Sequence, residues 1–310
     1  MAIVVIGTVF VDIKGFPLNN YIPGGRNAGE VNIVHGGVGR NVAEDIANVE
    51  LRPKYVSMVD ETALGESVIK KLNNHKVNTD YVVATPNGMG IWLAVFDETG
   101  DVTAAISKRP EITPMKNLIA EKGDEIFKDC DSIVIEVDID KEIVKETLKY
   151  ARKYNKKVFG LVANMSLAAE RRDLIKELDC FNCNEQEAGI LFVEELGQSI
   201  EEMQAALSKN VINANIKSMV VTLGDKGAVY ADVDGNSGHV EALKVHVRDT
   251  TGAGDAFCAG VSIGLTYGKK LSEAVEIGTK LAASVITISE NTCPRFLPTE
   301  LGIDIEMNDT

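Results

Sequence analysis

The feature that most constrains the fold is an alternation of short Val- and Ile-rich runs with amphipathic stretches of helical period. Strands joined by crossover helices give this pattern. Runs that are apolar throughout are typical of a parallel sheet covered by helices on both faces. We therefore predict an α/β fold with a mainly parallel sheet. The predicted strands are 3–7, 55–59, 132–137, 157–162 and 218–223, and the predicted helices include 63–72, 141–154 and 185–196.

Two stretches, residues 24–35 and 90–107, have strand patterns without helices between them. In the second, 91–96 and 102–106 flank a turn-rich segment and predict a β-hairpin. We expect strands within about residues 12–35 and 88–108 to form a small sheet inserted in a single domain, 1–310. Because ligands bind near the ends of parallel strands, this sheet would act as a lid. The alternative is an edge extension that does not move.

Composition narrows the class of protein. Apolar residues make up 45% and charged residues 25% of the 310 residues, which excludes disorder as the main state. The net charge of −14 disfavours nucleic acid and anionic membranes as partners. No apolar run approaches the ~20 residues that span a bilayer, and the N-terminus lacks a basic leader region. Five cysteines, an odd number, indicate reduced thiols, so we expect a cytoplasmic protein.

A glycine-rich segment, 249–260, predicts an anion-binding helix start. Backbone N–H groups of residues 252–255 can converge on an anion with the helix dipole behind them. Asp255 would be either a helix cap or a base kept ionised by the dipole. Gly260 and Gly264 cost about 2 kcal/mol together relative to Ala, which predicts close packing of this helix against a neighbour. The alternative is an ordinary glycine-rich helix start.

A second glycine-rich segment, 35–44, also opens a helix. It is not a dinucleotide-binding G-x-G-x-x-G motif, and the chain has no Walker P-loop. Gly36 and Gly37 would let a small ligand approach the backbone. The amide of Asn41 offers a donor and an acceptor that suit hydroxyl groups. The segment therefore predicts a polyol site, with a tight strand-to-helix turn as the alternative.

Together these segments resemble the two signatures of the ribokinase-like (PfkB) carbohydrate kinase family, and the resemblance covers most of the chain. Gly36-Gly37-x-Gly-x-Asn41 resembles the first signature and 249–255 resembles the second. Between them, Asn184-x-x-Glu187 and 221–227 lie where the family keeps its magnesium-related and nucleotide-binding motifs. The resemblance implies a three-layer α/β/α core with a β-sheet lid, and an ATP-dependent kinase.

The resemblance also implies roles for single residues. Asp255 would be the general base, and with Gly252, Ala253 and Gly254 it would form an anion hole for the transferred phosphoryl group. The residues implied to bind substrate hydroxyls are Asp12, Gly36, Gly37 and Asn41. Those implied at the ATP site are Asn184, Thr222, Gly224 and Gly227. Glu187 would act on Mg²⁺ through water, and Asp249 and Thr251 would lie near a monovalent-cation (K⁺) loop found in some members.

Within the family, the stretches 7–12, 36–43 and 97–107 are most similar to pseudouridine kinases. The implied reaction is phosphorylation of the hydroxymethyl (5′-type) hydroxyl of a ribosyl compound, with pseudouridine or a similar nucleoside first. A ribokinase- or fructokinase-type sugar kinase is the alternative, and a non-catalytic sensor is a remote one. The resemblance allows a homodimer through the lid. Residues 163–165 and 290–294 depart from the family pattern, which leaves the adenine contacts open.

Other candidate signals are weaker. Cys180 and Cys183 have Cys-x-x-Cys spacing but no second pair, so a zinc or redox site is a minor alternative. The four histidines lack metal-ligand spacing, and we expect those outside the motifs to be surface or core residues. Asp138 follows a predicted strand and would either face the substrate pocket or cap a helix.

Overall fold

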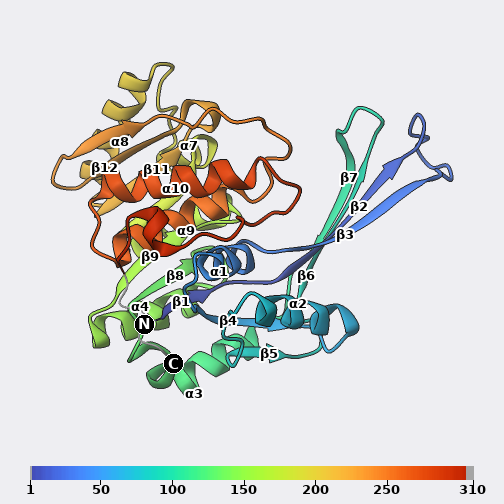
Figure 1. Cartoon of the computed structure of the whole chain (residues 1–310), viewed down its shortest axis with the longest axis horizontal. Coiled ribbons are helices and arrows are strands. Elements are labelled where there is room, and N and C mark those ends of the chain that lie inside the picture. The colour runs from blue at the N-terminus through green and yellow to red at the C-terminus, as the bar shows by residue number, and fades with distance from the viewer. Residues whose placement is uncertain (1, 305–310) are drawn as a thin grey trace.

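The computed structural model describes residues 2–304, whose largest element is a nine-stranded sheet of order β13-β12-β11-β10-β9-β8-β1-β4-β5 (Figure 1). The strands from β11 to β5 run parallel, and β12 and β13 are antiparallel at one edge. The strands of this sheet are β1 Ile3–Ile6, β4 Lys54–Val59, β5 Val82–Ala84, β8 Ser132–Glu136, β9 Lys157–Leu161, β10 Cys180–Asn184, β11 Ser218–Thr222, β12 Ala228–Asp232 and β13 Ser237–Val240.

Helices cover both faces of this sheet because alternate strand residues point to opposite sides. Val4 and Ile6 of β1 pack with α3, α4, α7 and α8, whereas Ile3 and Val5 pack with α1, α2, α9 and α10. The helices are α1 Val38–Asn48, α2 Ala63–Asn74, α3 Thr113–Phe127, α4 Lys141–Tyr154, α5 Met165–Ala168, α6 Arg172–Ile175, α7 Glu185–Phe192, α8 Ile200–Ala214, α9 Ala253–Thr266 and α10 Leu271–Val285. The predicted α/β/α core is confirmed.

The predicted strands match β1, β4, β8, β9 and β11 to within one residue at each end, and helix 141–154 matches α4. The prediction for 185–196 is wrong at its C-terminal end: α7 stops at Phe192 because Val193 takes a left-handed φ of 59°. Close packing of the glycine-containing helix is confirmed, since a Cβ on Gly260 would lie 2.7 Å from Gly278 Cα in α10. No helix within residues 2–304 is long and apolar enough to cross a membrane.

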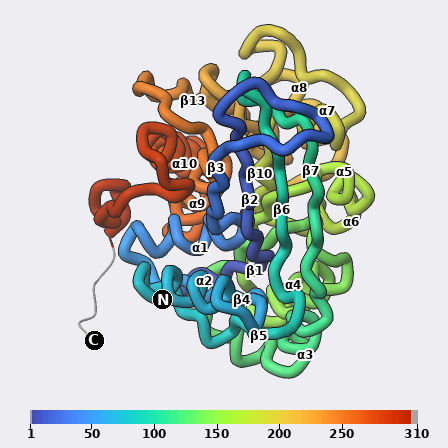
Figure 2. Tube along the Cα trace, turned by 90° about the vertical axis from the view of Figure 1, so that its right-hand side faces the viewer, coloured from blue at the N-terminus to red at the C-terminus, as the bar shows by residue number. Residues whose placement is uncertain are grey.

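A separate four-stranded sheet, of order β3-β2-β6-β7, extends away from the core (Figures 1 and 2). Its strands are β2 Phe10–Pro17, β3 Gly29–Gly36, β6 Gly90–Phe96 and β7 Val102–Lys108. The hairpin predicted over 90–107 is confirmed as β6 and β7. β2 begins two residues before the predicted range and follows β1 closely, and β3 leads directly into α1. The small sheet is therefore joined to the core at the carboxyl end of β1.

Candidate active site

Asp255 lies in the first turn of α9, at a helix start that is open to a ligand. Gly252 precedes the helix with a φ of 83°, and a Cβ there would lie 2.0 Å from Asn291 O, so the position requires glycine. The N–H of Ala253 donates to Thr250 O at 3.2 Å. Within residues 2–304, the N–H groups of Gly254 and Asp255 have no acceptor, and no atom beyond the chain neighbours and the backbone of α9 lies within 4 Å of the place of a Gly254 Cβ. This geometry suits an anion.

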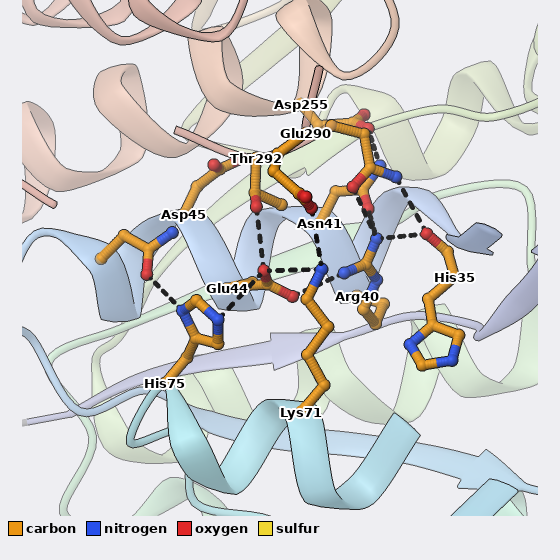
Figure 3. Close-up of polar contacts among 12 residues, drawn as sticks. His35, Arg40, Asn41, Glu44, Asp45, Lys71, His75, Asp255, Glu290 and Thr292 are labelled. Carbon is orange, nitrogen blue, oxygen red and sulfur yellow. Dashed lines mark hydrogen bonds and ion pairs between the residues drawn. The ribbon is translucent and has the colours of Figure 1, made fainter. Parts of the chain in front are cut away.

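The Asp255 carboxylate is held by one residue of the other glycine-rich segment. Asn41 Nδ2 donates to Asp255 Oδ2 at 2.6 Å (Figure 3). Burial raises the pKa of Asp255 to about 6, against the lowering effect of the Asn41 hydrogen bond and the Arg40 charge. Asp255 is therefore ionised at neutral pH yet close to the pKa that suits a general base.

A pocket of about 500 Å³ lies between the small sheet and the carboxyl ends of the core strands. It brings together five residues to which the family resemblance gave roles: Asp12, Gly36, Gly37, Asn41 and Thr251. Asp255, Gly252 and Gly254 lie beside the pocket, connected to it through Asn41, and are not part of its lining. Gly36 lies close to Asp12: a Cβ there would lie 2.9 Å from Asp12 Oδ2, so a side chain at this position would displace the Asp12 carboxylate.

The small sheet contributes a row of three side chains to the pocket. Asp12 in β2 pairs with Trp92 in β6, which pairs with Ser107 in β7, so their side chains share one face. All three line the pocket. Burial raises the pKa of Asp12, while Lys14 and Arg40 act in the opposite direction. Trp92 and Ser107 were not predicted as site residues, although both lie within the two strand stretches predicted from the sequence, where they turn out to be direct register partners.

The core contributes two carboxylates that the sequence analysis missed or left open. Glu136, at the end of β8, accepts hydrogen bonds from the backbone N–H of Thr8 at 3.1 Å and from Gly39, and burial raises its pKa to about 8. Asp138 accepts from the N–H groups of Ala163 and Asn164, and it lines the pocket. The helix cap is provided instead by Asp140, whose Oδ1 accepts from Glu142 N at 2.9 Å.

A second group of predicted residues lies at the carboxyl ends of β10 and β11, outside this pocket. Asn184 and Thr222 are register partners on the two strands. Asn184 and Glu187 form a capping box that starts α7, so their spacing also has a structural role. Gly224 and Gly227 have φ of 62° and 91° in the turn after β11. This edge of the sheet presents polar groups and glycine backbone to a ligand.

Glu187 interacts electrostatically both with the pocket residue Asp138 and with Asp255. Burial and the charge of Asp138 raise the pKa of Glu187, and the Glu187 charge in turn contributes to the raised pKa of Asp255. One Glu187 oxygen, Oε2, accepts from Asn184 N at 2.7 Å, and Oε1 has no hydrogen-bond donor among residues 2–304. A single half-buried carboxylate fits Mg²⁺, which keeps several waters. Among the described residues, no cluster of three or more His, Cys, Asp or Glu side chains could hold a metal ion by itself.

The remaining predicted positions are Asp249, in an exposed turn, and the cysteines, which are buried. Asp249 Oδ1 accepts from Thr251 N at 2.8 Å in an exposed turn, and this bond lowers the pKa of Asp249. All five cysteines are free and buried. Burial raises the pKa of the Cys180 thiol to about 12 and raises that of Cys183 as well, which argues against thiolate chemistry at the Cys-x-x-Cys pair.

Comparison with known proteins gives full-length matches. The family described as pfkB family carbohydrate kinase matches residues 2–295. The guanosine-inosine kinase of Exiguobacterium acetylicum is 34% identical over 291 residues, covering 93% of this chain and 95% of that protein. The pseudouridine kinase of Escherichia coli is 24% identical, covering 94% and 92%. An Arabidopsis thaliana ribokinase structure, complexed with ribose and ATP, matches with a TM-score of 0.84 at 22% identity, covering 97% and 99%.

Proposed function

Because this chain belongs to the pfkB family of carbohydrate kinases, we propose that it transfers the terminal phosphoryl group of ATP to the 5′-hydroxyl of a ribonucleoside. The observation that carries this proposal is Asp255, held by Asn41 at 2.6 Å, at an open helix start beside a pocket lined by Asp12 and Trp92. A base, an anion-binding helix start and a hydroxyl-binding pocket are the parts that phosphoryl transfer to an alcohol needs.

In the proposed mechanism, Asp255 accepts the proton of the attacking hydroxyl through its free Oδ1. Its Oδ2 remains bonded to Asn41 and keeps the carboxylate in place. The free N–H groups of Gly254 and Asp255 stabilise the negative charge of the transferred phosphoryl group. Most of the catalysis then comes from positioning and electrostatic stabilisation.

Trp92 favours a nucleoside over a free sugar as acceptor. Asp12 can accept hydrogen bonds from ribose hydroxyls, and Trp92 is its direct register partner in the same pocket. An indole ring offers a nucleobase a stacking surface, for which a free pentose has no counterpart. The identity of 34% to the guanosine-inosine kinase, compared with 24% to the pseudouridine kinase, supports guanosine and inosine as the first candidates and pseudouridine as the second. A ribokinase-type sugar kinase is the second candidate, supported by the similarity to ribokinases.

For the phosphoryl donor, we propose that ATP binds along the ends of β10 and β11, where Asn184, Thr222, Gly224 and Gly227 lie. Glu187 would hold Mg²⁺ through water, and the bound ion would neutralise charge on the phosphates. Asp249 and Thr251 would lie at a K⁺ site. Reduced, buried cysteines agree with action in the cytosol, where ATP is available.

We also propose that the small sheet acts as a lid and forms a homodimer through the face that points away from the pocket. There Ile33, Leu93 and Ile106 form a row with Ile13 and are 55%, 40% and 69% exposed. An apolar face of this kind marks an interaction surface. The test is molar mass in solution: the wild type should have twice the chain mass, and Ile106→Asp should be monomeric. A monomeric wild type would contradict the dimer.

The substrate is tested by measuring ATP-dependent phosphorylation with Mg²⁺ and K⁺ across guanosine, inosine, pseudouridine, uridine, adenosine, ribose and fructose. The proposal expects the largest kcat/KM with guanosine or inosine. A preference for pseudouridine would keep the nucleoside class and change the base. A preference for ribose or fructose would overturn the nucleoside assignment and leave the phosphotransferase mechanism in place.

A further inference from the structure

Arg40, the neighbour of Asn41 in α1, is a buried cation at the centre of a polar network (Figure 3). Its side chain is 1% exposed. Nη1 donates to Glu44 Oε2 at 2.5 Å, and Nη2 donates to His35 O at 2.6 Å. Nη2 also lies within hydrogen-bond distance of Asn291 Oδ1, at 3.1 Å, and donates to Asn41 Oδ1. Arg40 therefore contacts β3, α1 and the loop after α10.

The bond from Arg40 to Asn41 determines which end of the Asn41 amide faces Asp255. A guanidinium only donates hydrogen bonds and a carboxylate only accepts them. With Oδ1 on Arg40, Nδ2 has to point to Asp255, as observed. The reversed amide would set NH₂ against the guanidinium and oxygen against the carboxylate, so both contacts would become repulsive. We propose that Arg40 is a positioning residue that fixes the Asn41 amide and, through it, the orientation of the catalytic Asp255 carboxylate.

Arg40 can be removed without leaving an isolated charge in the core. Its partner Glu44 also interacts with Lys71 Nζ at 3.3 Å and His75 Nε2 at 3.6 Å, and accepts from Thr292 Oγ1 at 2.9 Å. Lys71 and His75 come from α2 and from the residue that follows it. Glu44 would therefore keep a charged partner in an Arg40 variant. Lys71 shares Glu44 with Arg40 but has no contact with Asn41 within the described residues, so it provides a matched control.

Several charged groups act on Asp255. These are Arg40 on α1 and Glu187 on α7, and the charge of Asp255 itself contributes to the raised pKa of Asp45, which also lies on α1. Arg40 is the positive member of this set and holds the pKa of Asp255 down, whereas Glu187 raises it. Asp45 is completely buried, and its own pKa is raised well above the usual value. Arg40 thus favours the ionised form of the base in addition to orienting it.

This inference rests on the proposed role of Asp255 as base, and the experiment separates the two. Arg40→Met, Arg40→Lys, Lys71→Met and Asp255→Asn are compared for kcat, KM for ATP and guanosine, and the pH profile of kcat. The ¹³C resonance of the Asp255 carboxyl, assigned by its loss in Asp255→Asn, gives the pKa without any need for turnover. If Asp255→Asn keeps full activity, the proposed base is wrong, whatever the Arg40 variants do.

We expect Arg40→Met to lower kcat at pH 7 by about tenfold or more and to raise the Asp255 pKa, with the KM for ATP unchanged. Arg40→Lys keeps the positive charge but loses the planar guanidinium, so the pKa of Asp255 should stay near the wild-type value while kcat falls. Lys71→Met should match the wild type both in kcat and in the pKa of Asp255. Wild-type kcat in Arg40→Lys, or an unchanged Asp255 pKa in a folded Arg40→Met protein, would overturn the proposal.

Discussion

Gly254→Ala should separate stability from catalysis. Gly254 lies in the first turn of α9, has no positive φ, and has no atom within 4 Å of the place of its Cβ. Alanine is a better helix former by about 1 kcal/mol, so the folded state should be as stable or slightly more stable. The added methyl group, however, would project into the open space at the helix start where we propose that the phosphoryl group binds. We expect unchanged or higher stability with kcat reduced by about 10²-fold or more.

The matched control is Gly252→Ala, the same change two residues earlier. There φ is 83° and the new Cβ would lie 2.0 Å from Asn291 O. An alanine in the left-handed conformation costs about 1–2 kcal/mol, and overpacking adds about 1–3 kcal/mol. The free energy of unfolding of Gly252→Ala should therefore be lower by about 2–5 kcal/mol. Urea unfolding of both variants with a common m-value measures the difference. Equal destabilisation of the two variants, or wild-type kcat in Gly254→Ala, would refute the reasoning.

Further predictions concern the base, the pocket and the core. Asp255→Asn should lower kcat by about 10²–10⁴-fold with little change in the KM for the nucleoside; near-normal turnover would exclude Asp255 as base. Because the pKa of Asp255 is about 6 in the ligand-free protein and the base has to be ionised, kcat/KM should reach a plateau above about pH 7 and fall on acidification through the pKa; a profile flat down to pH 4.5 would contradict this. Trp92→Ala should weaken nucleoside binding by about 1–3 kcal/mol and spare ribose, as measured by calorimetry. Gly260→Val, with its Cβ 2.7 Å from Gly278, should destabilise the fold in thermal unfolding, whereas unchanged stability would show that α9 and α10 can move apart.

The elements and the two glycine-rich segments could be predicted because their causes are local. Alternation of apolar strands and amphipathic helices depends on residues near each other in the chain, and so does the turn that places Gly252 at the start of α9. The end of α7 could not be predicted in this way. The amphipathic pattern continues to residue 196, but Val193 takes a left-handed conformation that β-branched residues rarely adopt.

The rest of the site depends on contacts between distant segments. Glu136 reads as part of an apolar strand, and only the fold shows that it accepts from Thr8, 128 residues away. The link between Arg40 and Asn291 spans 251 residues, and Trp92 meets Asp12 only through the pairing of β6 with β2. A motif identifies a functional residue through the residues next to it in the sequence, as the glycines around Asp255 do. Glu136, Arg40 and Trp92 act through tertiary contacts, so the residues next to them in the sequence do not identify them.

The small sheet has a consequence for how such an enzyme changes over evolutionary time. Three side chains proposed to bind the acceptor, Asp12, Trp92 and Ser107, belong to strands β2, β6 and β7, whereas the proposed base and the proposed donor site belong to residues 184–255. Much of the proposed acceptor recognition is thus encoded in a different stretch of the gene from the proposed transfer chemistry, although Asn41, which lines the pocket, also holds Asp255. Mutations in the first can alter which alcohol is accepted while the second remains under constant selection, so new specificities can arise by drift in a few strand residues.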